Sequence, residues 1–188
     1  MERETQGVRQ SQDFKNKMKV SNPLNDIAAN LGVTPKVLTQ LATGDDQEFR
    51  ELVRGIFSIL PEDEVALVAT DTSINPEFLD YLSRLFEDNP RILITILYNP
   101  ATSQATRKHV LDELAEDDIV SMSCDPKAPP DLLRAIGQKE YESSDIQVNL
   151  LANPTTPEDL KEQIIAESSA DVEPSELEGI NEADLLTP

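Results

Sequence analysis

Few side chains in this sequence have the types and spacing that catalysis or metal binding requires. His109 is the only histidine, so the chain holds no histidine relay and no two-histidine metal site. It follows Lys108 on a predicted helix, where we expect its side chain to face solvent. Cys124 is the only cysteine, and no neighbour in the sequence would activate its thiol. We therefore predict a small buried packing residue at Cys124 rather than a nucleophile.

The acidic clusters and the glycines add no catalytic pattern. Glu62, Asp63 and Glu64 lie at a predicted helix N-terminus, where carboxylates interact favourably with the helix dipole. This run lacks the alternating ligands and the central glycine of a calcium loop. The six glycines are scattered and form no phosphate-binding loop. The sequence predicts neither an enzyme nor a bound cofactor or metal.

The chain is strongly acidic, with 16 Lys and Arg against 36 Asp and Glu and a net charge of −20. Residues 1–20 hold five basic and three acidic side chains, a net +2, so the remainder carries −22. Direct binding to nucleic acid or to an anionic membrane surface is therefore disfavoured, and a basic protein partner is favoured. The simpler alternative is that the charge only maintains solubility.

Three features favour a cytoplasmic protein. One cysteine cannot form an internal disulfide, which fits a reducing compartment. No apolar run approaches the roughly 18 residues that a membrane span requires. The first residues lack the apolar segment of a signal peptide.

A helix–turn–helix pattern at residues 151–165 organises the rest of the chain. Asn153 and Pro154 end a helix, because proline lacks an N–H and disfavours the α conformation of the preceding residue. Thr156 is predicted to cap the next helix, with Pro157 at its first position. The predicted buried stripe of that helix comprises Leu160, Ile164 and Ile165.

Related turns recur upstream at nearly constant spacing. The equivalent helix starts, separated by 41, 27, 26 and 28 residues, are Pro35, Pro76, Ser103, Pro129 and Pro157. Such a period is typical of units that bury their apolar face by stacking on neighbours. The step of 41 residues has room for one extra helix.

The segments Leu151–Pro157 and Asn99–Thr102, each followed by a predicted helix, resemble the leucine-rich repeat variant group and, more loosely, HEAT-like α-solenoids. The resemblance covers roughly Asp26 to Ser168. It implies an all-α fold, a right-handed α-solenoid of about five helix-pair repeats. The steps are longer than the compact unit of that group, so ordinary helix pairs are expected. The iron–sulfur centre of some members requires a cysteine cluster that this chain lacks.

Composition divides the chain into a disordered polar and basic arm (1–21), a helical repeat domain (22–168) and a disordered acidic tail (169–188). The tail either docks on a partner through short apolar elements or only serves as a solvated extension of the chain.

The strongest amphipathic pattern comprises Phe49, Leu52, Val53, Ile56, Phe57 and Leu60. Residues 92–97 would indicate a strand by themselves, because they are β-branched. Their repeat equivalent, 146–151, is more helix-like, so both segments are predicted to be helices.

The sequence favours a non-enzymatic protein–protein interaction scaffold or adaptor that uses the concave face of its helical repeats. The candidate contacts are basic residues that we expect to be exposed on the second helices: Arg84, Arg107, Lys108, Arg134 and Lys161. The alternative is that these residues only form a solvated face and bind no partner. The alternative function is an acidic mimic of nucleic acid, or a regulator, that occupies a basic cleft of a DNA- or RNA-processing protein. A role inside a bacterial signalling or polarity complex rests on fold analogy alone.

Overall fold

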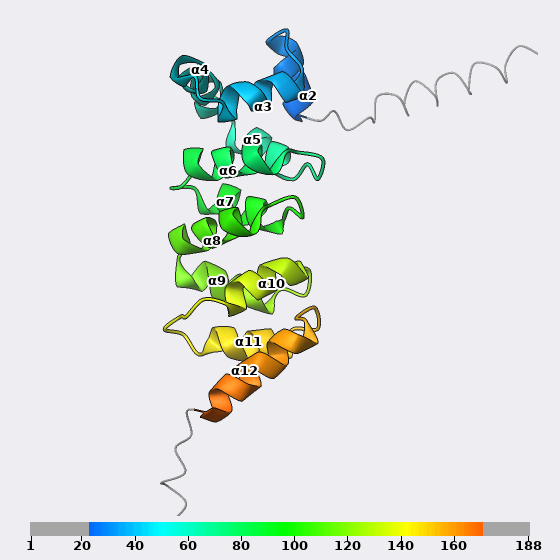
Figure 1. Ribbon diagram of the computed structural model, residues 1–188, viewed down its shortest axis with the longest axis vertical. Helices are drawn as coiled ribbons and strands as arrows, with labels where there is room; N and C mark the ends of the chain where they lie inside the picture. The colour runs from blue at the N-terminus through cyan, green and yellow to red at the C-terminus, as the bar shows by residue number, and fades with distance from the viewer. Residues whose placement is uncertain (1–22, 171–188) are drawn as a thin grey trace, which may run out of the picture. The chain divides into compact units, whose positions relative to one another are not determined.

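The computed structural model describes residues 23–170, and every regular element within them is a helix (Figure 1). The helices are α2 (Pro23–Asn30), α3 (Pro35–Thr43), α4 (Gln47–Ser58), α5 (Glu62–Ala69), α6 (Pro76–Leu85), α7 (Pro90–Tyr98), α8 (Gln104–Glu113), α9 (Glu116–Cys124), α10 (Pro130–Gly137), α11 (Asp145–Ala152) and α12 (Glu158–Ala170). The prediction of an all-α chain is confirmed for these residues. Residues 92–97 and 146–151 lie in α7 and α11 and form no strands.

The described residues form two compact units, 23–113 with α2 to α8 and 114–170 with α9 to α12. This boundary lies inside the span 22–168 that the sequence assigns to one repeat domain. The predicted arm, 1–21, and residues 171–188 of the predicted tail lie outside the described residues. None of the described helices combines the length and apolar character that crossing a membrane requires.

The turn between α2 and α3 ends one helix and starts the next through local backbone contacts. Gly32 has a φ of 68°, a conformation that glycine adopts without the penalty of a Cβ atom. The N–H of Val33 donates to the carbonyl of Ala28 at 2.9 Å, which closes the end of α2. The hydroxyl of Thr34 then accepts the N–H of Val37 at 3.3 Å and caps α3.

Helix α4 occupies the longer first step between helix starts. Asp46 caps it by accepting the N–H groups of Glu48 and Phe49 at 3.0 and 3.4 Å. Of its six-residue apolar pattern, Val53 and Phe57 are buried, but Phe49 and Leu52 are 47% and 58% exposed. The helix packs against α3, and Phe57 also contacts Phe78 of α6. Part of the strongest amphipathic signal in the sequence therefore faces outward.

Four later turns share one hydrogen-bond pattern. They join α5 to α6, α7 to α8, α9 to α10 and α11 to α12, and each begins with Asp71, Asn99, Asp125 or Asn153. The Oδ1 atom of this residue accepts the N–H two residues later at 2.9 Å, and its carbonyl accepts the N–H three residues later. The third residue after it is buried in every case, as Ile74, Thr102, Ala128 or Thr156.

The two asparagines among these four residues also join consecutive helix pairs. Asn99 Nδ2 donates to the carbonyl oxygens of Ala69 and Asp71 at 2.7 and 2.9 Å. Asn153 Nδ2 donates to those of Ser123 and Asp125, both at 2.9 Å. An aspartate has no such donor. The Asn-Pro motif therefore both ends a helix and ties its turn to the turn of the preceding helix pair in the same unit.

The prediction that Thr156 caps the last helix is wrong. Its side chain is 3% exposed, and its hydroxyl has no hydrogen-bond partner among the described residues. The N–H groups of Leu160 and Lys161 donate to the carbonyl of Pro157, which therefore precedes α12. Thr156 points inward because its position in the turn is a buried packing position. In the predicted stripe, Leu160 and Ile164 are buried, but Ile165 is 55% exposed.

The core of the first unit centres on Phe57 of α4 and Phe78 of α6. Their rings meet edge to face, with centroids 5.5 Å apart at 68°. Burial of each such side chain contributes roughly 1.5–3 kcal/mol. In the second unit, the fully covered side chains include Ile119, Leu132, Leu133, Ile136, Ile146 and Leu150.

Candidate functional site

The first unit carries two adjoining hollows, which together we call the unit 1 groove. The larger, of about 640 Å³, is lined by Ala42, Thr43, Arg50, Pro76, Glu77, Asp80, Tyr81, Arg84, Ser103, Ala105 and Thr106. The smaller, of about 430 Å³, is lined by Gln47, Arg50, Glu51, Arg54, Tyr81, Arg84 and Leu85. Arg50, Tyr81 and Arg84 line both hollows. The groove thus lies over α3, α4, α6 and α8.

Helix α6 supplies the centre of the groove. Asn75 caps it by accepting the N–H of Glu77 at 2.8 Å, and Pro76 is its first residue. Its core face carries Phe78, Leu79, Leu82 and Ser83, all buried. The helical period therefore directs Glu77, Asp80, Tyr81 and Arg84 toward the groove.

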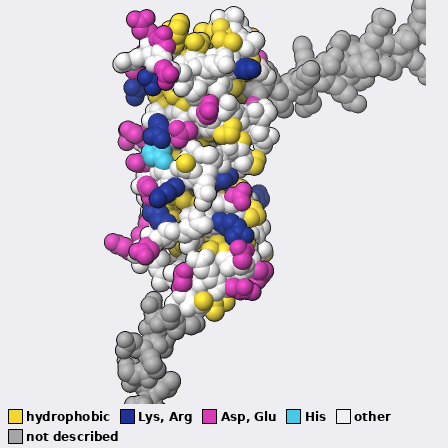
Figure 2. Space-filling view, in the orientation of Figure 1, with side chains coloured by type: hydrophobic (Ala, Val, Ile, Leu, Met, Phe, Trp, Pro, Cys, Tyr) yellow, Lys and Arg dark blue, Asp and Glu magenta, His cyan; other side chains and the backbone are white. Residues whose placement is uncertain are grey.

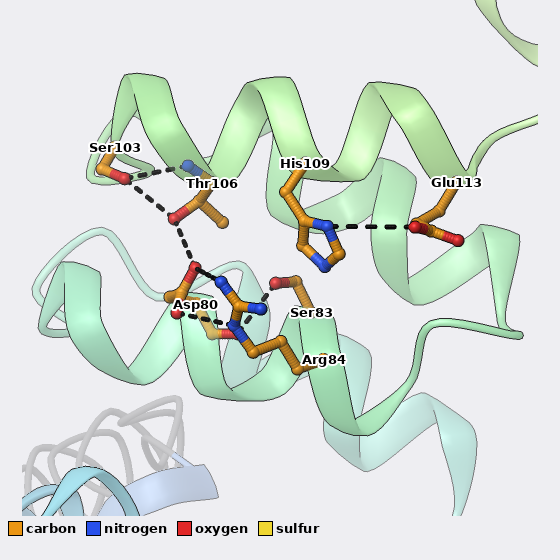
Figure 3. Close-up of polar contacts among 7 residues, drawn as sticks. All are labelled: Asp80, Ser83, Arg84, Ser103, Thr106, His109 and Glu113. Atoms are coloured by element: carbon orange, nitrogen blue, oxygen red, sulfur yellow. Dashed lines mark hydrogen bonds and ion pairs between the residues drawn. The ribbon is translucent and has the colours of Figure 1, made fainter.

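A chain of polar contacts crosses the groove from α6 to α8 (Figure 3). Arg84 Nε donates to Asp80 Oδ2 at 3.0 Å, and Thr106 Oγ1 donates to Asp80 Oδ1 at 3.2 Å. Ser103 caps α8 by accepting the N–H of Thr106 at 3.1 Å, and the two hydroxyls are 2.8 Å apart. Asp80 therefore holds Arg84 in place and connects the two helices.

Tyr81 forms an aromatic wall of the groove. Its ring stacks on Phe78, with centroids 5.7 Å apart and an angle of 30°. Its Oη atom is covered and has no hydrogen-bond partner among the described residues. Burial raises the pKa of Tyr81 from 10.0 to about 12, Arg54 opposes this rise, and Glu51 adds to it. A covered hydroxyl without a partner costs about 1–3 kcal/mol.

Helix α4 adds two arginines to the groove. Arg54 lies 3.8 Å from Glu51, and both side chains are exposed, so this pair is held weakly. Arg50 is exposed and forms no ion pair or side-chain hydrogen bond with residues 23–170. On the molecular face shown in Figure 2, Lys and Arg side chains lie among Asp and Glu side chains and form no continuous basic surface.

His109 and Cys124 are not placed as predicted. His109 is on α8, with a side chain only 25% exposed, and its Nδ1 atom is 3.9 Å from Glu113 Oε1. Its Nε2 atom is covered because α8 packs against α6. This atom has no hydrogen-bond partner among the described residues (Figure 3). Cys124 is exposed, and the adjacent Ser123 takes the buried position. Within residues 23–170, no group of three or more His, Cys, Asp or Glu side chains could hold a metal ion.

Three of the predicted contact residues belong to the first unit. Arg84 is exposed in the groove, and Lys108 is exposed on α8. Arg107 is only 5% exposed, and its Nη2 atom donates to the carbonyl of Asn99 at 3.3 Å. The expectation that Arg107 is exposed is therefore wrong, because its guanidinium covers the turn that precedes α8.

The other two predicted contacts belong to the second unit, where both pair with the acidic start of α12. Arg134 binds both oxygens of Asp159, at 2.5 and 2.8 Å. This contact raises the pKa of Arg134 and lowers the pKa of Asp159. Lys161 Nζ lies 3.3 Å from Glu158 Oε1.

Sequence reasoning missed most of the groove. It placed no site on Arg50 and Arg54 of α4, on Asp80 and Tyr81 of α6, or on Thr106 of α8. One available signal was the spacing of Asp80 and Arg84, four residues apart on a helix, which predicts an ion pair. No short stretch of the sequence indicates that α4 packs beside α6.

Comparison of this chain with protein families, with curated proteins and with solved structures finds no match. The resemblance to leucine-rich repeat variants and HEAT-like solenoids therefore stays a prediction.

Proposed function

We propose that this chain is a non-enzymatic protein-interaction module of the cytoplasm, and that the unit 1 groove holds its protein partner. The observation that carries the proposal is the grouping of Tyr81 with Arg50 and Arg84 along a groove formed by two hollows of about 640 and 430 Å³. Tyrosine and arginine contribute disproportionately to the binding energy of protein interfaces.

The proposal includes the arrangement of the helix pairs as a right-handed α-solenoid of about five repeats. The four equivalent turns support it, because identical hydrogen bonds recur where the sequence period places them. Apart from Arg50 of α4, the larger hollow is lined by residues at α3, α6 and α8, the second helices of three pairs. The concave surface of a solenoid is built from such helices and serves to bind proteins.

Affinity capture after crosslinking in cells tests this function. The variant Arg50→Glu reverses the one groove arginine without an ion-pair partner among the described residues. The matched control is Lys36→Glu, which reverses an exposed charge near the N-terminal end of α3. We expect the wild-type chain and the control to recover the same protein, and Arg50→Glu to recover about tenfold less, a loss of 1.4 kcal/mol.

Equal recovery by all three chains would overturn the assignment of the groove. Salt-sensitive recovery of a DNA- or RNA-processing protein that does not depend on Arg50 would instead favour a mimic of nucleic acid, because surface charge attraction is screened by salt.

A further inference from the structure

The smaller hollow of the groove concentrates positive charge in a unit that is otherwise acidic. Over residues 23–113, Asp and Glu outnumber Lys and Arg by 15 to 7. Three of these seven cations, Arg50, Arg54 and Arg84, line this one hollow, where Glu51 is the only acidic lining residue. The lining residues therefore sum to +2, opposite in sign to the charge of the unit, and Asp80 of the adjoining hollow, which pairs with Arg84, offsets one of these charges.

All three arginines have donor groups to offer a ligand. Arg50 has no partner among the described residues. Arg54 forms only a weak ion pair, in which its Nη1 atom lies 3.8 Å from Oε1 of the exposed Glu51. Arg84 uses Nε and, at 3.5 Å, Nη2 to reach Asp80. A guanidinium group carries five N–H donors in a planar fork that matches the two oxygens of a carboxylate.

We propose that the hollow lined by Arg50, Arg54, Arg84 and Tyr81 binds an acidic segment of the protein partner, with an aspartate or glutamate side chain held between the arginines. This inference rests on the proposed function and specifies the chemistry of the partner at the groove. The acidic balance of the whole chain favours a basic partner, but a net charge does not describe this one hollow, where three of the seven cations of the unit meet.

The surroundings of the hollow favour a single carboxylate or a closely spaced pair over a polyanion. The adjoining hollow contains Glu77 and Asp80, and α4 begins beside Asp46 and Glu48. A nucleic-acid strand leaving the arginines would meet these carboxylates, and it would gain little from releasing counterions. An acidic peptide segment places one or two charges in the hollow and continues with neutral residues.

Nuclear magnetic resonance of the arginine Nε–Hε groups tests this inference on the full chain. The probe is the tripeptide acetyl-Glu-Ser-Glu-amide, added at constant ionic strength, with acetyl-Gln-Ser-Gln-amide as the uncharged control. We expect saturable shifts at Arg50 and Arg54 with the acidic probe only, because the Nε–H of Arg84 already donates to Asp80. Arg134, which already binds Asp159, serves as the internal reference and should not shift.

A matched pair of variants separates a specific site from general attraction. Arg50→Gln should weaken binding of the acidic tripeptide by about tenfold, a factor equal to 1.4 kcal/mol, whereas Lys36→Gln should leave it unchanged. Equal shifts with both tripeptides, a uniform response of all exposed arginines, or tighter binding of a short oligothymidylate would each overturn the inference.

The outcomes distinguish this inference from the proposed function. If Arg50→Glu abolishes partner capture but the acidic tripeptide does not bind, the groove binds a protein by other chemistry and the carboxylate site is wrong. If the tripeptide binds with the expected dependence on Arg50 but partner capture does not depend on that residue, the anion site stands and the assignment of the groove to the partner fails.

Discussion

Asn99 and Asn153 hold equivalent positions in the two compact units. The side-chain Nδ2 of each donates to two backbone carbonyl oxygens, one 30 and one 28 residues earlier in the chain. Both side chains are buried, so water cannot replace these bonds easily. Each asparagine therefore stabilises the packing of two successive helix pairs.

Replacing Asn99 with aspartate should destabilise the first unit severely. Asn99→Asp removes both donors and places a carboxylate against two buried carbonyl oxygens, a change that we expect to lower the free energy of unfolding by about 2–4 kcal/mol. Asn153→Asp should have a similar effect on the second unit. Urea unfolding followed by far-UV circular dichroism measures both losses.

The control for these variants is Asn75→Asp. Asn75 is exposed, and only its Oδ1 atom is used, to accept the N–H of Glu77 at 2.8 Å. An aspartate caps a helix equally well, so we expect a change within about 0.5 kcal/mol. Losses of the same size at all three positions would show that the donated bonds of Asn99 and Asn153 have no special value.

Local features of the sequence predicted the helices and turns well. The Asn-Pro motif, the Thr34 cap and the conformation of Gly32 each depend on a few neighbouring residues, so their chemistry can be read from the sequence. The recurrence of the motif also resolved residues 92–97, whose β-branched side chains alone indicated a strand. Repetition was more informative than propensity in this segment, because equivalent units adopt equivalent structure.

Features that depend on tertiary packing were not predictable in the same way. Thr156 is of a type that commonly caps a helix, but its side chain is buried in the turn. Arg107 is of a type that is commonly exposed, but its side chain is buried and donates to the carbonyl of Asn99. The groove brings Arg50 and Arg54 close to Tyr81, because α4 packs beside α6. The helical period indicated which side of each helix is apolar, but not which two helices meet.

Gly55 offers a stabilising substitution within α4. It lies inside the helix, and an added Cβ would have no neighbour within 4 Å. Gly55→Ala should therefore raise the free energy of unfolding by about 0.5–1 kcal/mol, because glycine loses more backbone entropy than alanine on forming a helix. Urea unfolding measures the gain.

The opposite effect is expected at Gly32, where an added Cβ also meets open space but φ is +68°. Gly32→Ala forces a side chain into the left-handed region and should lower stability by roughly 1–2 kcal/mol. If both glycine variants changed stability in the same direction, backbone conformation would not be the deciding factor at these two positions.

The contact between Arg134 and Asp159 predicts that the pKa of Asp159 is lowered, and this lowering can be measured. The guanidinium lowers the pKa of Asp159 below its ordinary value of 3.8, so the contact stabilises the second unit above pH 3.8, and this contribution is lost as the pH falls through the lowered pKa. Arg134→Ala should raise the pKa of Asp159 toward its ordinary value, because the largest cause of the lowering is removed, and Arg134→Lys should raise it less. Titration of the carboxyl carbon resonance follows both, and an unchanged pKa in Arg134→Ala would refute the pairing in solution.

Tyr81→Phe should stabilise the first unit, and the gain should grow at high pH. The substitution removes a covered hydroxyl that has no described partner, which we expect to raise the free energy of unfolding by about 1 kcal/mol at neutral pH. Because burial raises the pKa of Tyr81 from 10.0 to about 12, the folded chain holds this proton more tightly than the unfolded chain does. The stability that depends on the protonated phenol is complete below pH 10 and is lost as the pH rises through 12.

Urea midpoints of the wild-type chain should therefore fall more steeply than those of Tyr81→Phe between pH 10 and 12. Tyrosinate absorbance supplies the independent control, since the wild-type spectrum should contain one late-titrating phenol that the variant lacks. A loss of stability at neutral pH in Tyr81→Phe would mean that Oη donates a hydrogen bond in solution. Parallel midpoints across this pH range would mean that Tyr81 ionises as readily in the folded chain as in the unfolded one.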